Sequence, residues 1–414
     1  MAVPSGLPTE LDYVVLLFAL FVVPRMLQRY RLPAAVSAVG LGALAGMGFG
    51  LFTGDATVRL LAALGIVALF LFAGLEVDLI DLRREARVIL QHLAIATGLL
   101  AFTTVLAHVA LRLEWRPAAL VALALLTPST GFILDSLPTL GVSRDERFWI
   151  KAKAIASELL ALGLLFVVLQ STTAARLSWS ALALVGMILI LPLLFRFFAA
   201  RILPYAPRSE FAFLVMLAVL CAFLTRRLGV YYLVGAFVVG LAAQNFRRQL
   251  PAIASDRTLQ AVELFASFFV PFYFFAAGLK FHADDFGWGA VVVGGAFLVI
   301  IVPVRIAAVA LHRQAVLGED LRVAARIGVA TLPTLVFTLV IAEILRERFA
   351  VAPEIFGGLI IYTLANTLVP GFSLRLPAAD LDIWHEPEPA RGESPQWVGS
   401  ATSQDLPSGE RRRG

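Results

Sequence analysis

Long apolar stretches separated by short polar segments cover residues 11–373 of the chain. A helix needs about 20 apolar residues to cross the hydrocarbon of a bilayer, and the sequence holds thirteen stretches of this kind. None shows the strand-length alternation typical of a membrane barrel. The pattern predicts an all-α membrane protein with thirteen transmembrane helices, over residues 11–30, 33–53, 57–79, 86–112, 117–140, 148–170, 177–202, 209–226, 229–246, 258–280, 286–312, 321–346 and 354–373.

The composition supports a membrane protein and narrows the partner classes. Hydrophobic residues make up 60% of the chain and charged residues 15%, with a mean hydropathy of +0.86. Soluble domains have about 45–50% apolar and about 25% charged residues. The net charge of +5 comes from basic residues spread over the predicted loops, so we expect no nucleic-acid partner. Cys221 is the single cysteine, which excludes an internal disulfide framework.

Two short sequences occur twice, each time 204 residues apart. The Ala-Gly-Leu-Glu motif at 73–76 returns as Ala-Gly-Leu-Lys at 277–280, and Thr-Pro-Ser-Thr at 127–130 returns loosely as Thr-Leu-Pro-Thr at 331–334. Thirteen helices divide into six, one linker and six, so the second half would enter the membrane inverted. Inverted repeats with a proline-interrupted helix in each half are typical of secondary transporters, whose binding sites lie at the interruptions.

Basic residues in the loops predict the orientation. One set of loops contains 18 Arg and Lys residues, and the opposite set contains 9. The positive-inside rule then places the N-terminus outside and the C-terminus in the cytoplasm. Residues 1–10 are expected to form a short extracytoplasmic segment. Residues 374–414, rich in Pro, Glu, Ser and Arg, are expected to form a disordered cytoplasmic tail.

Few ionisable residues are expected inside a membrane unless they have a task, because each costs at least about 2.5–3.5 kcal/mol at mid-membrane. Glu158 lies among apolar residues about nine positions into the sixth stretch and is the first candidate for an ion-binding carboxylate. Arg305 lies well inside the eleventh stretch. A broken helix exposes carbonyls that carry about half a negative charge, so we expect Arg305 to neutralise such ends rather than to bind a cation.

Other charged positions leave alternatives open. Asp135 could contribute to an inner funnel and bind the ion, or it could pair with Lys153. Glu263 could likewise line the funnel or form a salt bridge, and Glu343 is expected to be structural. The five histidines show no metal-binding spacing.

The two interruptions supply oxygen atoms. Irregular backbone at membrane depth is tolerated only where it is buried in protein or lines a cavity, so carbonyl oxygens are available there. Hydroxyl, carbonyl and carboxylate oxygens together suit a small monovalent cation. The hydroxyl-bearing candidates are Thr127, Ser129, Thr130, Thr331 and Thr334.

The chain resembles the monovalent cation:proton antiporter-2 family, which includes NapA-type sodium/proton and Kef-type potassium exchangers. The resemblance covers about residues 11–373 and rests on the stretches 68–79, 127–130, 154–162 and 269–279. It implies an NhaA/NapA-like fold of six, one and six helices, with two crossed discontinuous helices. It also implies a homodimer in a bacterial-type inner membrane, with dimerisation helices 1–3 and 8–10, core helices 4–6 and 11–13, and helix 7 as the linker.

By this resemblance Glu158 is the carboxylate shared by proton and cation, and Arg305 occupies the basic position of helix 11. Many relatives have a second acidic or an amide residue where this chain has Ser157. We expect Ser157 to contribute an oxygen beside Glu158. Because serine does not ionise, the sequence predicts electroneutral exchange of one proton for one cation.

The sequence thus predicts an antiporter that exchanges Na⁺ for H⁺ and needs no cofactor and no enzymatic chemistry. A potassium/proton antiporter remains open. A sodium-coupled symporter for an organic anion is the rival from another class, because it can share the crossed-helix architecture. A non-transporting sensor is disfavoured, since the tail is too short for a signalling domain.

Overall fold

The computed structural model describes residues 10–77, 83, 85–229, 232–247 and 255–374. The expected segments at 1–10 and 374–414 therefore lie almost entirely outside the described residues, as does the end of the third predicted stretch. The described residues form helices and no strands. This confirms the prediction of an all-α protein.

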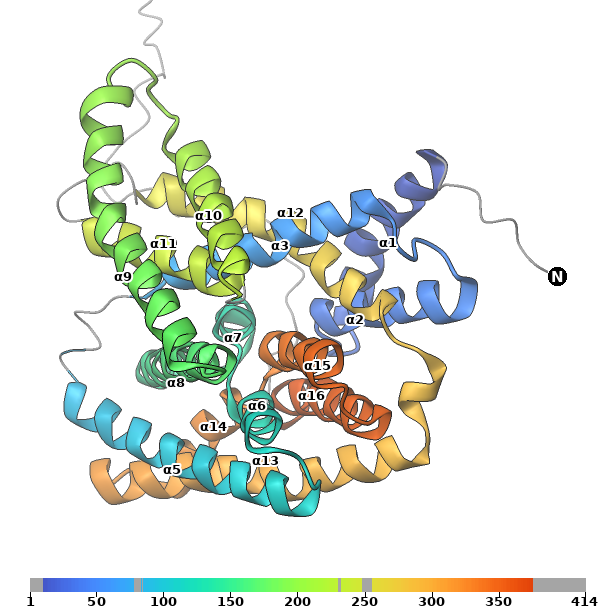
Figure 1. Ribbon diagram of the computed structural model, residues 1–414. Helices are drawn as coiled ribbons and strands as arrows, with labels where there is room; N and C mark the ends of the chain where they lie inside the picture. Colours follow the sequence, from blue (N-terminus) through green and yellow to red (C-terminus); the bar gives the residue numbers. More distant parts are fainter. Residues whose placement is uncertain (1–9, 78–82, 84, 230–231, 248–254, 375–414) are drawn as a thin grey trace, which may run out of the picture. The chain divides into compact units, whose positions relative to one another are not determined.

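One group of helices is built around α3 (Ala56–Leu75), which packs along both α11 (Tyr232–Phe246) and α12 (Asp256–Leu279). α2 (Ala34–Ala43) packs on α12, α1 (Glu10–Gln28) on α2, and α10 (Glu210–Arg227) on α11 (Figure 1). Asp55 caps α3 and Ser255 caps α12, each by accepting a hydrogen bond from a backbone amide of the first turn.

Glycines allow these helices to approach closely. A Cβ atom added to Gly74 or Gly240 would lie 2.3 Å from a carbonyl oxygen across the α3–α11 contact. A Cβ on Gly42 or Gly278 would lie 2.0 or 2.1 Å from a carbonyl oxygen across the α2–α12 contact. Small residues of this kind let backbones meet inside membranes. Gly74 and Gly278 belong to the repeated motif, so its glycine has the same packing task in both halves.

A second group surrounds the two helix interruptions. In the first half it contains α5 (Ala86–Ala110), α6 (Trp115–Leu126), α7 (Thr130–Ser136) and α8 (Arg144–Gln170). In the second half it contains α13 (Trp288–Leu317), α14 (Leu321–Ala330), α15 (Leu335–Phe349) and α16 (Pro353–Ser373). α9 (Ala174–Phe197) contacts α8 of this group and α11 of the first (Figure 1).

The proline-containing motifs interrupt helices, as the sequence predicted. Residues 127–129 separate α6 from α7, and residues 331–334 separate α14 from α15, which are bent by 49° relative to each other. Pro128 and Pro333 lie within these interruptions, where a missing amide and a restricted preceding residue both oppose a continuous helix. Each interruption therefore leaves helix ends inside the second group.

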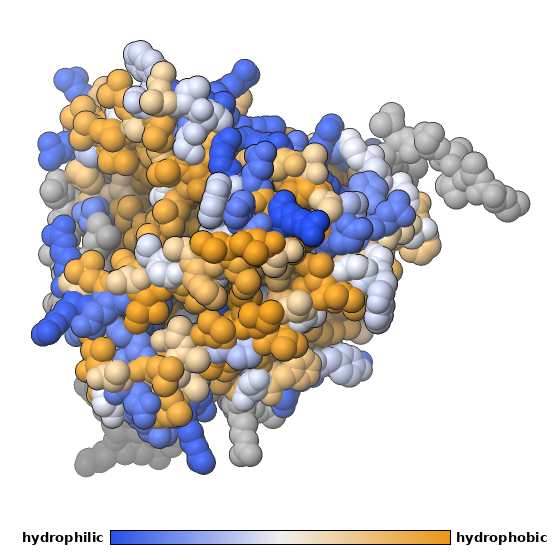
Figure 2. Space-filling view, turned by 60° about the horizontal axis from the view of Figure 1, so that its bottom comes forward, coloured by the Kyte–Doolittle hydropathy of each residue, from blue (hydrophilic) through white to orange (hydrophobic). Residues whose placement is uncertain are grey.

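Eight helices of the described residues are long and apolar enough to cross a membrane, and α14 with α15 makes a ninth bent span. Ala34–Gly48 and Leu233–Phe246 are apolar but shorter. Figure 2 shows hydrophobic residues over much of the visible face. Large apolar side chains such as Leu182, Leu189 and Val299 are exposed. A soluble protein rarely exposes apolar side chains on this scale, so the chain is a multi-pass membrane protein.

Candidate functional site

The two interruptions are joined directly by Ser129. Its backbone amide donates to the carbonyl oxygen of Pro333 over 2.8 Å. Its Oγ accepts from the amides of Val336 and Phe337, at 3.0 and 3.4 Å, in the first turn of α15. These amides have no partner within their own helix. Ser129 of one half thus caps the half-helix of the other half, and its hydroxyl oxygen is occupied.

Arg305 lies against the carbonyl ends of two half-helices. Its Nη1 donates to the Leu332 carbonyl over 2.7 Å and to the Leu125 carbonyl over 3.3 Å, and Nη2 donates to the Thr331 carbonyl over 2.8 Å. Leu125 is near the end of α6, and the other two follow the end of α14. The guanidinium therefore compensates the negative ends of both interrupted helices, in the geometry that a fork of several donors allows.

Polar side chains of α15 and α16 complete this arrangement, and our sequence analysis missed them. The Tyr362 hydroxyl donates to the Leu125 carbonyl over 2.7 Å, and Thr338 Oγ1 donates to the Ala124 carbonyl over 2.7 Å. Asn366 Nδ2 donates to Thr334 Oγ1 over 3.1 Å. All three side chains are fully buried. In the sequence each of the three is an uncharged polar residue within an apolar stretch. We considered charged residues inside such stretches and therefore did not select them.

Glu158 is buried beside the first interruption, with 3% of its surface exposed. One carboxylate oxygen accepts from the backbone amide of Thr130 over 3.2 Å. The Thr130 side chain is close to the same carboxyl group, and its buried hydroxyl has no hydrogen-bond partner among the described residues. The carboxylate thus lies at the amide end of α7, where the helix dipole favours a negative charge, and no described side chain forms an ion pair with it.

A cavity of about 10 Å³ adjoins Glu158. It has room for about one water molecule or an ion of similar size. Ser129, Thr130 and Gly131 line one side, and the other side is formed by Leu69, Phe70 and Ala73 of α3 with Val336 of α15. The carboxylate therefore lies where the interrupted helices of the second group meet α3 of the first.

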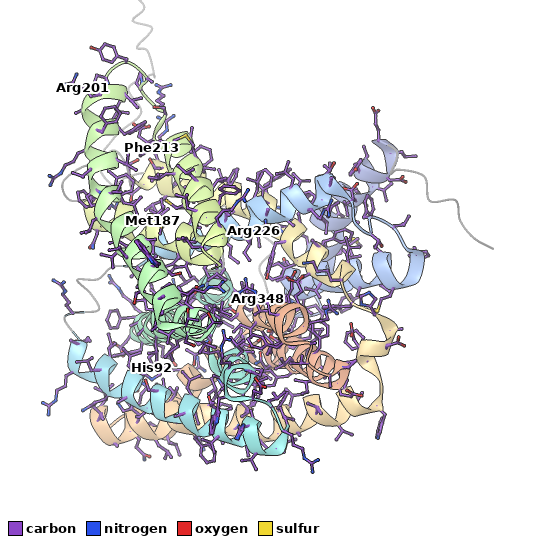
Figure 3. All side chains as sticks on the ribbon, in the orientation of Figure 1. His92, Met187, Arg201, Phe213, Arg226 and Arg348 are labelled. Carbon is purple, nitrogen blue, oxygen red and sulfur yellow. The ribbon has the colours of Figure 1, made fainter. Side chains whose placement is uncertain are left out.

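Ser157 lines a different cavity, so the structure does not bring its hydroxyl together with the Glu158 carboxyl. Ser157 Oγ lies 3.0 Å from Nε2 of His92. Figure 3 labels His92, which belongs to α5. The two lie at a cavity of about 60 Å³, which Thr127 and Thr331 also line. Adjacent residues of a helix point about 100° apart because a turn contains about 3.6 residues. This explains why neighbours in sequence serve two cavities.

The hydroxyl groups of Thr331 and Thr334 have hydrogen-bond partners outside the small cavity. The Thr331 hydroxyl donates to carbonyls of its own helix, those of Ile327 and Gly328. Thr334 Oγ1 belongs to a buried network with Thr338 and Asn366. The Asp135 side chain lies outside the described part of the structure. Of the nine candidate positions, Glu158 and Thr130 share the small cavity with Ser129, whose oxygen already accepts two hydrogen bonds.

Two further charged positions have partners. The Lys280 ammonium of the repeated motif pairs with Glu343 on α15, in agreement with the structural role expected for Glu343. Glu76 in the first copy of the motif pairs with Lys151 on α8.

Glu263 is exposed on α12. Within the described ranges, no group of three or more His, Cys, Asp or Glu residues could hold a metal ion.

A family model for the transmembrane sodium/hydrogen exchangers matches residues 15–379. The chain belongs to the sodium/hydrogen exchanger family. Among curated relatives, Probable Na(+)/H(+) antiporter 3 of Methanocaldococcus jannaschii is 25% identical over 383 residues, covering 86% of this chain and 94% of that protein. Na(+)/H(+) antiporter NhaS5 of Synechocystis sp. is 23% identical over 287 residues, covering 67% of this chain and 40% of its own length.

The exchanger fold also appears in solved structures. The sodium proton antiporter MjNhaP1 from Methanocaldococcus jannaschii, determined at pH 8, matches with a TM-score of 0.64 at 13% identity. The match covers 88% of this chain and 95% of that one. The relatives are named as antiporters, which are secondary transporters and not enzymes. The match of the family model shows the exchanger family, and the antiporter-2 branch within it stays a prediction.

Proposed function

We propose that this exchanger is a secondary active antiporter that exchanges Na⁺ for H⁺ by alternating access. The observation that carries the proposal is the Glu158 carboxyl, buried at the amide end of α7 and free of a fixed cationic partner in the described structure. A buried carboxyl favours its neutral form when no cation is near. One group can therefore hold a proton or a sodium ion in turn.

The cavity beside Glu158 supports a dehydrated monovalent cation as the alternative to the proton. Carboxylate oxygen from Glu158 and hydroxyl oxygen from Thr130 are hard ligands, and both residues line the cavity. Its volume of about 10 Å³ suits one ion and is too small for an organic anion. This disfavours the symporter. Potassium remains the alternative cation for the same site.

We propose exchange of one proton for one cation, with no net charge moved. Glu158 is the carboxyl group beside the small cavity, Ser157 does not ionise, and Arg305 remains charged because guanidinium groups hold their proton. The loaded carboxyl is then neutral with either ion, whereas the empty site is charged. A neutral site crosses the apolar barrier more easily than a charged one. The core therefore moves when it holds a proton or a cation and not when it is empty, and this couples the movement of the two ions.

The packing supports a division of labour between the two helix groups. We propose that thirteen spans form two inverted repeats, that α1–α3 and α10–α12 form the dimerisation domain, and that the second group carries the ion as a mobile core, with α9 as linker. The paired glycine contacts at 74, 240, 42 and 278 support the repeat. We place the protein in a bacterial-type inner membrane as a homodimer, with the N-terminus outside and the C-terminus in the cytoplasm.

Movement of the core would have to rearrange two ion pairs. Glu76 pairs with Lys151, and Lys280 pairs with Glu343. These two ion pairs connect the C-terminal ends of α3 and α12 to the second group of helices. Both pairs are partly exposed, and such pairs contribute about 0–1 kcal/mol each. They can therefore favour one position of the core without preventing its motion.

The proposal is tested with purified protein in vesicles that contain a pH-sensitive dye. Addition of Na⁺ should move protons across the membrane, and Glu158→Gln should abolish the signal while the protein still folds. Glu263→Gln is the matched control, because it removes an exposed glutamate outside the site. Exchange retained in Glu158→Gln would refute the assignment. A steady state that depends on an imposed membrane voltage would refute electroneutrality, and addition of K⁺ or Li⁺ instead of Na⁺ identifies the preferred cation.

A further inference from the structure

The larger cavity, lined by α5, α8 and α13, is basic. Lys153, Arg305 and His92 contribute its ionisable side chains, and hydroxyls of Ser157, Thr127 and Thr331 contribute further polar atoms. No carboxylate of the described residues lines it. Its volume of about 60 Å³ exceeds that of the cavity beside Glu158. A basic cavity has no part in holding Na⁺, which it would repel, so it needs a separate explanation.

The buried Lys153 side chain is the residue of this cavity whose presence the cation site does not explain. Its side chain is 2% exposed, and its ammonium contacts His312 Nδ1 over 3.4 Å. An ammonium only donates, so Nδ1 accepts from Lys153 and the ring hydrogen is on Nε2, which lies 3.4 Å from the side-chain amide oxygen of Gln91. The ammonium therefore has a neutral partner in the described residues, and a buried cation is normally paired.

The nearby charges on α13 do not balance Lys153. Arg313 forms an ion pair with Glu319, which follows α13, so the carboxylate that interacts electrostatically with Lys153 is already neutralised. The Arg305 guanidinium is directed to the carbonyls of Leu332 and Thr331. On α5, His92 contributes an imidazole and no negative charge. The helices around the cavity thus present one uncompensated ammonium together with hydroxyl and imidazole donors.

We propose that this cavity binds a small monovalent inorganic anion of halide size, held by the Lys153 ammonium and by a hydrogen bond from the Ser157 hydroxyl, whose oxygen accepts from His92 Nε2. On the scale on which about 10–15 Å³ holds one water molecule, a cavity of about 60 Å³ has room for a chloride ion together with water. The anion supplies the negative charge that no described side chain supplies, and it lies on the face of α8 that is turned away from Glu158. The site is thus separate from the cation site and goes beyond the proposed exchange activity.

The test is thermal unfolding of the purified full-length protein in detergent, with sodium chloride titrated against sodium gluconate at constant Na⁺ and ionic strength. Chloride should raise the unfolding temperature saturably, by about 2 °C at ten times its dissociation constant, and bromide should do the same. No membrane gradient is present, so the result is independent of whether the protein exchanges Na⁺ for H⁺.

Lys153→Met should remove the chloride-dependent rise. Lys151→Met is the matched control, because Lys151 lies two residues away on the same helix, is partly exposed and pairs with Glu76. That variant should retain the rise. Equal unfolding temperatures in chloride and gluconate would overturn the proposal, as would an unchanged chloride effect in Lys153→Met. The first result would be expected if Lys153 carries no charge.

Direct detection of the bound anion in the wild-type protein tests the proposal even if Lys153→Met fails to fold. Crystals of the wild-type protein grown in sodium bromide should show anomalous bromide scattering between Lys153 and Ser157. Bromide density elsewhere only, or none at all, would contradict the proposed site.

Discussion

Replacing Arg305 with methionine tests how the helix interruptions are held together. The substitution removes the strong hydrogen bonds to the carbonyls of Leu332 and Thr331, at 2.7 and 2.8 Å. The Leu125 carbonyl loses a longer bond but keeps the Tyr362 hydroxyl at 2.7 Å. Two buried carbonyls, rather than three, therefore lose their side-chain donor.

Each hydrogen bond to a charged group contributes about 1.5–3 kcal/mol. Two give about 3–6 kcal/mol, and polar contacts between membrane helices tend to the weaker end, so we expect a loss of about 3 kcal/mol. For a protein of 414 residues that corresponds to a fall of about 3 °C in the unfolding temperature. Arg305→Lys keeps a charge but lacks the planar fork, and should fall by about half as much.

The assay is thermal unfolding of the purified variants in detergent, followed by intrinsic fluorescence. Arg322→Met is the matched control, because it removes an exposed arginine from the first turn of α14, the helix that precedes the same interruption. The control should unfold within about 1 °C of the wild type, as exposed substitutions usually do. An Arg305→Met protein that is as stable as this control would refute the argument that the guanidinium compensates the two helix ends.

Three further substitutions test neighbouring parts of the account. Ser129→Ala removes the cap of α15 and should destabilise the protein by about 1 kcal/mol, measured by the same unfolding assay; no change would contradict the capping role. Tyr362→Phe should cost about 1 kcal/mol and should be non-additive with Arg305→Met, because both contact the Leu125 carbonyl; simple additivity would argue against a shared task. Glu343→Lys should slow exchange in vesicles by placing a like charge beside Lys280, and adding Lys280→Glu should restore the rate; a double variant as slow as the single one would exclude this ion pair from the transport cycle.

Much of the helical framework could be predicted because apolar length and proline position are local signals. The interruptions after Leu126 and Ala330 follow from Pro128 and Pro333, and the structure places both where the sequence indicated. The glycines of the repeated motif likewise allow close packing in both halves. Apolar length alone overstates some spans, since the described helix over Ala34–Gly48 is shorter than the apolar stretch 33–53 that contains it.

The contacts within the candidate site could not be predicted from the sequence to the same extent. Ser129 and Thr130 are adjacent and chemically alike, yet one caps a half-helix of the other repeat and the other faces Glu158. Ser157 faces His92, because helix rotation separates it from its neighbour. Which partner each side chain contacts depends on the direction in which it points after the helices have packed. The residue types alone do not determine that direction.

The central claim is that Glu158 holds either a proton or a sodium ion. Calorimetric titration of Na⁺ into the purified protein, repeated in buffers with different ionisation enthalpies, measures the protons released for each ion bound. The account predicts release of about one proton per Na⁺ by the wild type and no release by Glu158→Gln. Sodium binding without proton release, or release that persists in Glu158→Gln, would contradict it.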